Sequence, residues 1–475
     1  MTQNKELHLP DIRRLRHMMY VCLLLTALSL TLVIWLCRPG GNHLPWKQPN
    51  RVTSKPQTSG RKHATHNQIP GNKVVPGRSA SLVKVNGTKT LLTSAFLEHR
   101  FTKKEVRVIA IVLRSEKVDY RCHLRCENQL NISSGFRFIH HDHFGFPYGA
   151  AHIMCPVPPS CESPAHIAIT SAASEPKDEM ELHFLEVENQ RTDSFYFHDF
   201  TVCISTMFNF TNALQLVQSL EMFKILGVNR VVVYKTNCSM ETQRALNYYA
   251  QTGFVEEVPW SLSEFLSVSD YWSPEHNPGV LHYFGQIPAL NDCLYRHMYQ
   301  AKYVAMHDID ELILPQSVDS WVDLLPLLEK NFGVDKCYQF ENNVFPNNIV
   351  LPPSMPETKP PAQGCWKSVT GVNILEHLYQ EPVNLRNVGK SFKIIVNPQA
   401  VFTTSVHGVL KSTNGCVWVN RTIARMYHTR SQQQTLLKPG DLIYDGRLLD
   451  YSKRLLTAVN KALREIGLLS GDHVC

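Results

Sequence analysis

The chain has 475 residues, 43% of them hydrophobic and 19% charged, and a formal net charge of +7. That charge is unevenly distributed: residues 1–17 carry a net +2 and residues 38–104 a net +12, which leaves −7 for residues 105–475. The large carboxyl-terminal body is therefore mildly acidic, which argues against nucleic-acid binding and against a basic membrane-binding surface.

The first predicted element is a transmembrane helix. The run from Met18 to Cys37 contains no charged residue and, at twenty residues, is long enough to cross a hydrocarbon core of roughly 30 Å. A cleaved signal peptide would have an apolar core of about 7–15 residues followed by small residues, whereas Arg38–Gly40 follow here. We therefore expect an uncleaved signal-anchor, with residues 1–17 as a cytosolic tail and a single pass through the membrane.

Five N-glycosylation sequons follow the predicted anchor. They begin at Asn86, Asn131, Asn209, Asn237 and Asn420. Such sites are used in secretory compartments, so they favour a type II orientation with the carboxyl-terminal body in the lumen, as a glycoprotein.

Eleven of the thirteen cysteines lie beyond the anchor, and in an oxidising lumen we expect several of them to form disulfides. Cys122, Cys126, Cys155 and Cys161 could instead be zinc ligands, but no second CxxC-type pair accompanies them, so disulfides are the favoured interpretation. The odd number leaves at least one cysteine unpaired. Cys475 could pair with another chain, which leaves a homodimer open.

Residues 38–100 are rich in Pro, Gly, Ser and Asn and predict a flexible stem. We expect residues 101–195 to form a mostly β accessory module, because several segments there have strand-like patterns separated by polar turns. These segments are Lys104–Leu113, Gly135–His140, Ala165–Ser171 and Glu181–Glu188.

Strands and helices alternate from Phe200 onward. The predicted strands are Thr201–Met207, Arg230–Lys235, Phe254–Pro259 and Lys302–His307, and the predicted helices are Asn212–Leu226, Ser239–Gln251 and Gly285–Gln300. This order predicts an α/β domain over residues 196–475, with a largely parallel sheet and crossover helices. Neither a Gly-x-Gly-x-x-Gly sequence nor a P-loop follows the first strand, so a phosphate would have to be held by a metal ion.

The last of these strands runs into Asp308, Ile309 and Asp310. Two carboxylates two residues apart lie on one face, at the carboxyl edge where open α/β sheets bind ligands. Hard oxygen ligands suit Mn²⁺ or Mg²⁺, which can grip a diphosphate and neutralise it as it leaves. The pair therefore predicts group transfer from a nucleotide-activated donor. Asp308 could also accept a hydrogen bond from the ribose. Alternatively, both acids could be ordinary turn residues that bind no ligand.

Other side chains are candidates for the same site. His407 is the first choice and His428 the second for an imidazole ligand, although either could be a structural histidine. Gln286 and Asp292 could line the nucleotide-sugar pocket. Asp292 could equally form an ordinary pair with Arg296, four residues further along the same helix.

Several sequence pieces recur in a characteristic order. They are Cys203, Glu221–Tyr234, Gly285–Gln286, Asn291–Arg296, Asp308–Glu311 with Pro315, Lys390–Pro398, Val406–His407 and Tyr427–Arg430. Together they resemble the family 92 glycosyltransferases, Golgi type II membrane enzymes with a GT-A-like nucleotide-sugar-binding fold.

The resemblance implies a metal-dependent, inverting galactosyltransferase. Its cofactor would be Mn²⁺ or Mg²⁺ and its donor UDP-galactose. The product would be a β link, commonly β1,4, to a galactose or fucose on an N-glycan of a glycoprotein. Two alternatives stay open: transfer of another UDP-sugar, or a catalytically inactive, membrane-anchored glycan-binding protein.

Inversion needs a base that deprotonates the acceptor hydroxyl while the diphosphate leaves. Glu341, shortly after the acidic strand, is a candidate, and the alternative is an edge-strand carboxylate. A sugar could also stack on an aromatic side chain, although tryptophans more often lie in a core. The candidates for that contact are Trp260, Trp272 and Trp366.

Overall fold

The computed structural model describes residues 82–469, except 128, 175, 193–194, 277–278, 352–365 and 385–388, all within one unit, Asn72–Cys475. The predicted tail, the anchor at 18–37 and most of the predicted stem lie outside these residues. No helix in the described part of the chain combines the length and the apolar character needed to cross a membrane.

The N-terminal module is an eight-stranded sheet. Its strands are β1 (Val83–Lys84), β2 (Leu91–Glu98), β3 (Glu105–Leu113), β4 (Tyr120–Cys126), β5 (Gln129–Ile139), β6 (Tyr148–Pro156), β7 (His166–Ser171) and β8 (Leu185–Glu188). They lie in the order β1-β2-β3-β6-β5-β4-β7-β8, and β2 also pairs with β8, so the sheet returns on itself. The four segments predicted as strands fall in β3, β5, β7 and β8.

The ordered sheet begins earlier than the sequence predicts. β2 lies within residues 38–100, for which a flexible stem is expected, yet every residue from Leu91 to Glu98 is buried. The average composition of residues 38–100 is dominated by the Pro- and Gly-rich residues at its start. This average hides the apolar segment Leu91–Glu98 at its end. Residues 83–98 therefore belong to the module, which corrects the predicted boundary at residue 101.

The second sheet has nine strands and begins after the module. Its strands are β9 (His198–Met207), β10 (Arg230–Lys235), β11 (Val255–Pro259), β12 (Ala301–His307), β13 (Glu311–Pro315), β14 (Cys337–Pro346), β16 (Phe392–Val396), β19 (Cys416–Trp418) and β20 (Ala424–Arg430). The order is β11-β10-β9-β12-β16-β14-β20-β13, with β19 beside β14. The first four strands are parallel, as predicted, and the remainder of the sheet is mixed.

Five helices and two small strand pairs complete this mixed α/β fold in the described residues. The helices are α2 (Ala213–Leu226), α3 (Met240–Gln251), α4 (Gln286–Arg296), α5 (Trp321–Phe332) and α6 (Ser452–Ile466). The strand pairs are β15 (Tyr379–Gln380) with β21 (Ile443–Tyr444), and β17 (Val401–Ser405) with β18 (Gly408–Ser412). Short 3-10 helices are η1 (Glu179–Glu181), η2 (Leu262–Glu264), η3 (Tyr283–Gly285), η4 (Ile374–Glu376), η5 (Pro398–Ala400), η6 (Pro439–Asp441) and η7 (Arg447–Tyr451).

Polar caps fix where the predicted helices begin. The side chain of Asn212 accepts the backbone N–H of Gln215 at the start of α2, and Ser239 accepts that of Thr242 at the start of α3. The helix predicted over Gly285–Gln300 is α4, which is shorter than predicted and ends at Arg296.

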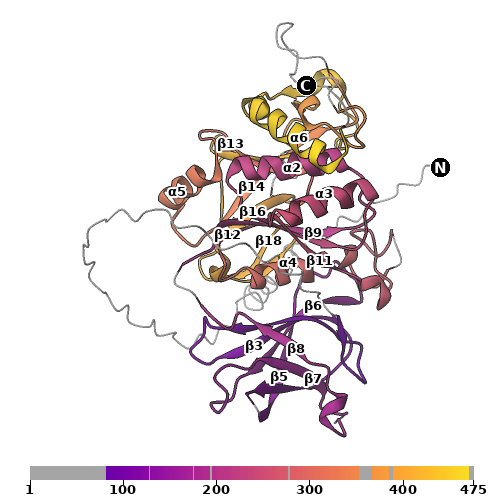
Figure 1. Ribbon diagram of the computed structural model, residues 1–475, viewed down its shortest axis with the longest axis vertical. Coiled ribbons are helices and arrows are strands. Elements are labelled where there is room, and N and C mark those ends of the chain that lie inside the picture. Colours follow the sequence, from indigo (N-terminus) through magenta and orange to yellow (C-terminus); the bar gives the residue numbers. More distant parts are fainter. Residues whose placement is uncertain are drawn as a thin grey trace, which may run out of the picture. The chain divides into compact units, whose positions relative to one another are not determined.

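The two faces of the nine-stranded sheet are covered by different helices. α2 and α3 lie on one side and α4 on the other (Figure 1). Side chains alternate accordingly: Val231 and Val233 of β10 join the core that contains α2, whereas Val232 and Tyr234 join the core that contains α4. The α4 core also includes apolar side chains of β2 and β3, so the module and the sheet are joined through one hydrophobic core.

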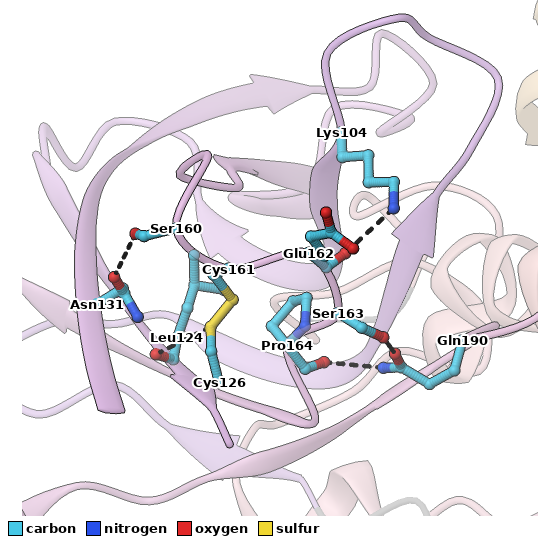
Figure 2. The surroundings of a disulfide bond; sticks show 10 residues. All are labelled: Lys104, Leu124, Cys126, Asn131, Ser160, Cys161, Glu162, Ser163, Pro164 and Gln190. Carbon is cyan, nitrogen blue, oxygen red and sulfur yellow. Dashed lines mark hydrogen bonds between the residues drawn. A yellow bond between two sulfur atoms is a disulfide. The ribbon is translucent and has the colours of Figure 1, made fainter. Parts of the chain in front are cut away.

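Four disulfides are present among the described residues. They are Cys122–Cys155, Cys126–Cys161, Cys203–Cys293 and Cys337–Cys416. The prediction of disulfides rather than zinc ligands in the module is therefore confirmed. Figure 2 shows that the segment after Cys161 is also tied by hydrogen bonds: Nζ of Lys104 donates to the carbonyl of Glu162 at 3.1 Å, and Nε2 of Gln190 donates to that of Pro164 at 2.8 Å.

We predict that a chain beginning at residue 101 will be insoluble, whereas one beginning at Asn72 will fold. Burial of an apolar side chain contributes about 1.5–3 kcal/mol, and β2 buries Leu91, Leu92, Phe96 and Leu97. Their sum is comparable with a net stability of about 5–15 kcal/mol. Soluble yield and circular dichroism of the two truncations provide the measurement, and equal folding of both would contradict the placement of β2 in the core.

Candidate active site

A cavity of about 860 Å³ opens at the carboxyl end of β9 and β12. It is lined by both predicted acids, Asp308 and Asp310, and by both predicted histidines, His407 and His428. Gln286, at the start of α4, lines it as well. Five of the seven side chains singled out from the sequence are thus brought together at the sheet edge where ligands are expected.

The two acids lie on a tight turn between β12 and β13. The side chain of Glu311 closes this turn by accepting the backbone N–H of Asp308 at 2.9 Å, and the N–H of Glu311 donates to the carbonyl of Asp308 at 3.3 Å. Glu311 is therefore a structural part of the turn, and it leaves Asp308 and Asp310 directed toward the cavity.

The pairing of β13 with β20 places His428 beside the acids. Glu311 is opposite His428 in this register, and Nε2 of His428 lies 3.2 Å from Oδ2 of Asp310. Burial alone would lower the pKa of His428, but the charge and hydrogen bond of Asp310, together with the charge of Glu311, outweigh it and the pKa is raised. His407 has no such partner: its Nδ1 lies 3.3 Å from the carbonyl oxygen of Phe392.

A buried lysine, which the sequence analysis did not assign to the site, neutralises the acidic turn. Lys393 on β16 is only 2% exposed. Its Nζ donates to Oδ2 of Asp308 at 2.7 Å and lies 3.4 Å from Oε2 of Glu311. Burial raises the pKa of Asp308, but the charge and hydrogen bond of Lys393, together with the nearby His428 and His407, outweigh it and lower the pKa to about 2. Asp308 is therefore ionised at neutral pH and already has a cationic partner.

Ser205 and Gln286 hold the other oxygen of Asp308. Oγ of Ser205 donates to Oδ1 of Asp308 at 3.1 Å, and Nε2 of Gln286 donates to Oγ of Ser205 at 2.6 Å. The Cys203–Cys293 disulfide joins the strand that carries Ser205 to the helix that carries Gln286.

Asp292, by contrast, does not reach the cavity. It is fully buried on α4, where Nε of Arg296 donates to its Oδ2 at 3.0 Å and the hydroxyl of Tyr234 donates to the same oxygen. Of the two sequence interpretations, the helical ion pair is the one that the structure contains.

The side chains of this site can hold a divalent cation only if a bound substrate or water completes its coordination. No group of three or more His, Cys, Asp or Glu side chains in the described residues is arranged to hold a metal ion. Asp310 and His428 nevertheless offer a carboxylate and an imidazole to the cavity, a donor set that Mn²⁺ accepts. Such a cation can take its remaining ligands from substrate phosphates and water.

The cavity also has cationic and aromatic walls, in which Trp272 is the residue that the sequence had already singled out. Lys390 and Arg430 are exposed and line it, as do Trp272 and Tyr283. Burial, together with the charges of Asp308 and Asp310, raises the pKa of Tyr283.

The other two candidate tryptophans belong to the core. Nε1 of Trp260 donates to the carbonyl oxygen of Phe284 at 2.9 Å, and Nε1 of Trp366 donates to Oδ1 of Asn460 at 2.7 Å. Both indoles are buried, so of the three tryptophans only Trp272 lines the cavity.

Glu341 lines a second cavity of about 590 Å³ rather than the first. Residues shared by the two linings, among them Asn342 and Lys390, make the cavities adjacent. Glu341 is 8% exposed, its Oε1 has no hydrogen-bond partner in the described residues, and this atom lies 3.6 Å from Nε of Arg421.

Comparison with known proteins identifies the class of protein. Residues 198–465, more than half of the chain, match the model of glycosyltransferase family 92. A glycosyltransferase family 92 protein of Caenorhabditis elegans is 29% identical over 121 residues, 25% of this chain and 23% of the relative. A β-1,4-galactosyltransferase of the same organism is 24% identical over 127 residues, 26% of this chain and 27% of the relative.

The matched region contains both sheet-edge acids, both histidines and Lys393, so the family match and the cavity coincide. The aligned part of the chain spans about a quarter of the length of each relative. The chain belongs to glycosyltransferase family 92.

We predict that Lys393→Met will lower the stability of the protein by about 3–5 kcal/mol, because it leaves the buried carboxyl of Glu311 and the partly exposed carboxylate of Asp308 without a counter-charge. The melting temperature should fall by roughly 5–10 °C. Adding Glu311→Gln to this variant should recover part of the loss, since it removes one of the uncompensated acids. Lys453→Met, at an exposed position of α6, is the matched control. Thermal unfolding without nucleotide or metal is the measurement, and a Lys393→Met variant as stable as the control would contradict the assigned role.

Proposed function

We propose that this protein transfers galactose from UDP-galactose, with inversion and dependence on a divalent cation, to a glycan acceptor. The acceptor would be a galactose or fucose on an N-glycan of a glycoprotein, and the new bond a β1,4 link. The observation that carries the proposal is the cavity at the end of β9 and β12, where Asp310, His428, Lys390 and Arg430 gather. The β1,4-galactosyl specificity rests on the name of one relative and on the family resemblance.

The cavity offers separate groups for the two charged parts of the donor. Asp310 and His428 would hold Mn²⁺ or Mg²⁺, and Lys390 and Arg430 would contact the diphosphate. When bound, the cation would neutralise negative charge on the departing UDP. Asp308 would orient the ribose or a bound water through the oxygens that Lys393 and Ser205 keep in place.

The second cavity is the proposed acceptor site, and Glu341 is the proposed base. The acceptor oxygen would form a bond to the anomeric carbon while the bond from that carbon to the β-phosphate oxygen breaks. The electron pair of the broken bond would leave with UDP, and the acceptor proton would pass to Glu341. The position of Glu341 in the lining of the second cavity supports this role, and its Oε1 accepts no hydrogen bond among the described residues.

We also propose a cellular location for the protein, the Golgi membrane. A Golgi membrane protein of type II topology, anchored through residues 18–37 with its body in the lumen, would meet nucleotide sugars and glycoproteins. The four disulfides and the exposed asparagines of four sequons, Asn86, Asn209, Asn237 and Asn420, support an oxidising, glycosylating compartment. The proposed fold type is GT-A-like, and a homodimer remains part of the proposal.

Two other functions would use the same cavity. Another UDP-sugar would fit the same phosphate groups, since the sugar is selected by the shape of the pocket. A glycan-binding protein without catalysis would retain the cavity but would not need Asp310 and His428 to face each other at 3.2 Å.

A panel of UDP-sugars tests the proposal directly. The purified protein, with Mn²⁺ and acceptors ending in galactose or fucose, should release UDP fastest from UDP-galactose. Absence of transfer and of donor hydrolysis with every sugar would contradict an enzyme, and retained glycan binding in the same samples would favour the binding protein.

We predict that Asp310→Asn and His428→Ala will each weaken the binding of Mn²⁺ in the presence of UDP by at least about 10-fold. Changes to residues that merely support a metal ligand already cost roughly 10–100-fold. His407→Ala, in the same cavity but without contact to Asp310, should have a smaller effect. Electron paramagnetic resonance of Mn²⁺ measures this without turnover, and a larger loss in His407→Ala would restore His407 as the preferred ligand.

We predict that Glu341→Gln will lower kcat by about 10²–10⁴-fold, the usual contribution of a general base. The KM for the donor should stay within about twofold, because Glu341 does not line the donor cavity. Arg421→Gln, which removes the neighbouring cation and leaves the carboxylate, is the control. An unchanged kcat in Glu341→Gln would assign the base to another residue.

A further inference from the structure

The N-terminal module contributes a side chain to the wall of the active-site cavity. The loop between β5 and β6, residues 140–147, extends from the module, and Phe144 is the one residue of the module among those that line the cavity in the described part of the chain. Its side chain is partly accessible, with 37% of the residue exposed.

Several contacts fix this loop in place. Oγ of Ser405, on β17, donates to Oδ2 of Asp142 at 2.5 Å, and the backbone N–H of Tyr148 donates to the carbonyl of Val280 at 3.0 Å. Within the module, Nε of Arg114 donates to the carbonyl of Phe146 at 2.7 Å. The loop is thus held on both sides of Phe144, and the phenyl ring has a defined position.

The ring of Phe144 continues an aromatic wall that reaches the histidine side of the site. It stands edge-on to Trp272, with centroids 5.4 Å apart at 88°, and it stacks on the buried His282 at 4.2 Å. Trp272 in turn stacks on His407 at 5.3 Å and 6°. The wall therefore extends from the module to a residue that faces the same cavity as the acids.

The backbone at Phe144 has a conformation that is unfavourable for a bulky side chain. Phe144 has a φ of 50°, in the left-handed region that a bulky side chain adopts only at a cost. Tyr283, which also lines the cavity, has a φ of 37°. Unfavourable backbone conformations of this kind persist at functional sites, where the surrounding contacts enforce them. Asparagine or glycine would adopt this φ more readily than phenylalanine. The backbone conformation therefore does not account for phenylalanine here, and we look to the ring for its role.

We propose that Phe144 contacts the pyranose ring of a sugar in this cavity, so that the N-terminal module takes part in substrate selection. The inference rests on the proposed function and names a residue that determines which sugar is accepted. A pyranose has a C–H face that packs against aromatic rings. Phe144 and Trp272 present an aromatic surface of this kind to the cavity, beside the apolar lining that Ile204, Met207, Phe208, Phe210, Ile309 and Met426 supply.

The test compares two variants at Phe144 with a control on the same module. Phe144→Ala removes the ring, and Phe144→Asn removes it while suiting the positive φ. Phe136→Ala is the control, because Phe136 is 59% exposed on β5 and does not line the cavity. Binding of UDP and of UDP-galactose by calorimetry, KM for donor and acceptor, and melting temperature are measured for each.

Both Phe144 variants should keep the affinity for UDP and lose about tenfold in one sugar-dependent quantity. A loss of UDP-galactose affinity and a raised donor KM would assign the contact to the donor sugar, and a raised acceptor KM alone would assign it to the acceptor. Unchanged values for both sugars in a folded Phe144→Asn variant would overturn the proposal. Equal losses for UDP and UDP-galactose would do so too, because the ring would then act on the nucleotide or on the fold.

The test of Phe144 can be distinguished from the test of the proposed galactosyltransferase activity. If the unaltered protein shows no turnover with any UDP-sugar, the galactosyltransferase proposal fails on that result alone. The difference in affinity between UDP and UDP-galactose still reports on Phe144, since it requires binding and not transfer.

Discussion

One buried cation balances the acidic turn, and the rest of the site depends on that balance. Three acidic residues fall within four residues after β12, and an uncompensated charge on Glu311, the buried one of the three, would cost several kcal/mol. Lys393 supplies the counter-charge from β16, so the antiparallel pairing of β16 with β12 is as necessary to the site as the turn itself. Because Asp308 is held by Lys393 and Ser205, the groups left to face a ligand together are Asp310 and His428.

The site is formed mainly by the order of strands in the sheet, and only in part by a local sequence motif. β9, β12, β16 and β20 contribute Ser205, the acids, Lys393 and His428, and these strands are distant in sequence but neighbours or near neighbours in the sheet. The Cys203–Cys293 disulfide locks the first of these strands to α4. The N-terminal module then closes one wall through Phe144, and the hydrophobic core that it shares with the α/β region holds the module against that region.

The sequence predicts best what local signals encode. The strands and helices from β9 to β12 follow from apolar periodicity and from caps such as Asn212, and the acids follow from their position after a buried strand. Lys393 was missed although a lysine inside the apolar run Phe392–Val396 is itself a signal of a buried partner. The closer approach of His428 than His407 to Asp310 depends on the β13–β20 register, and the role of Phe144 on a tertiary contact, neither of which a single sequence encodes locally.

The arrangement of ligand, cation and walls can be observed in one experiment. A crystal of the protein grown with Mn²⁺ and UDP, measured near the manganese absorption edge, would locate the metal by its anomalous signal. We expect a single strong peak in the cavity, adjacent to Asp310 and His428, with the diphosphate beside Lys390 and with Lys393 still paired to Asp308. A peak elsewhere, a displaced Lys393, or UDP bound outside the cavity would contradict this expectation.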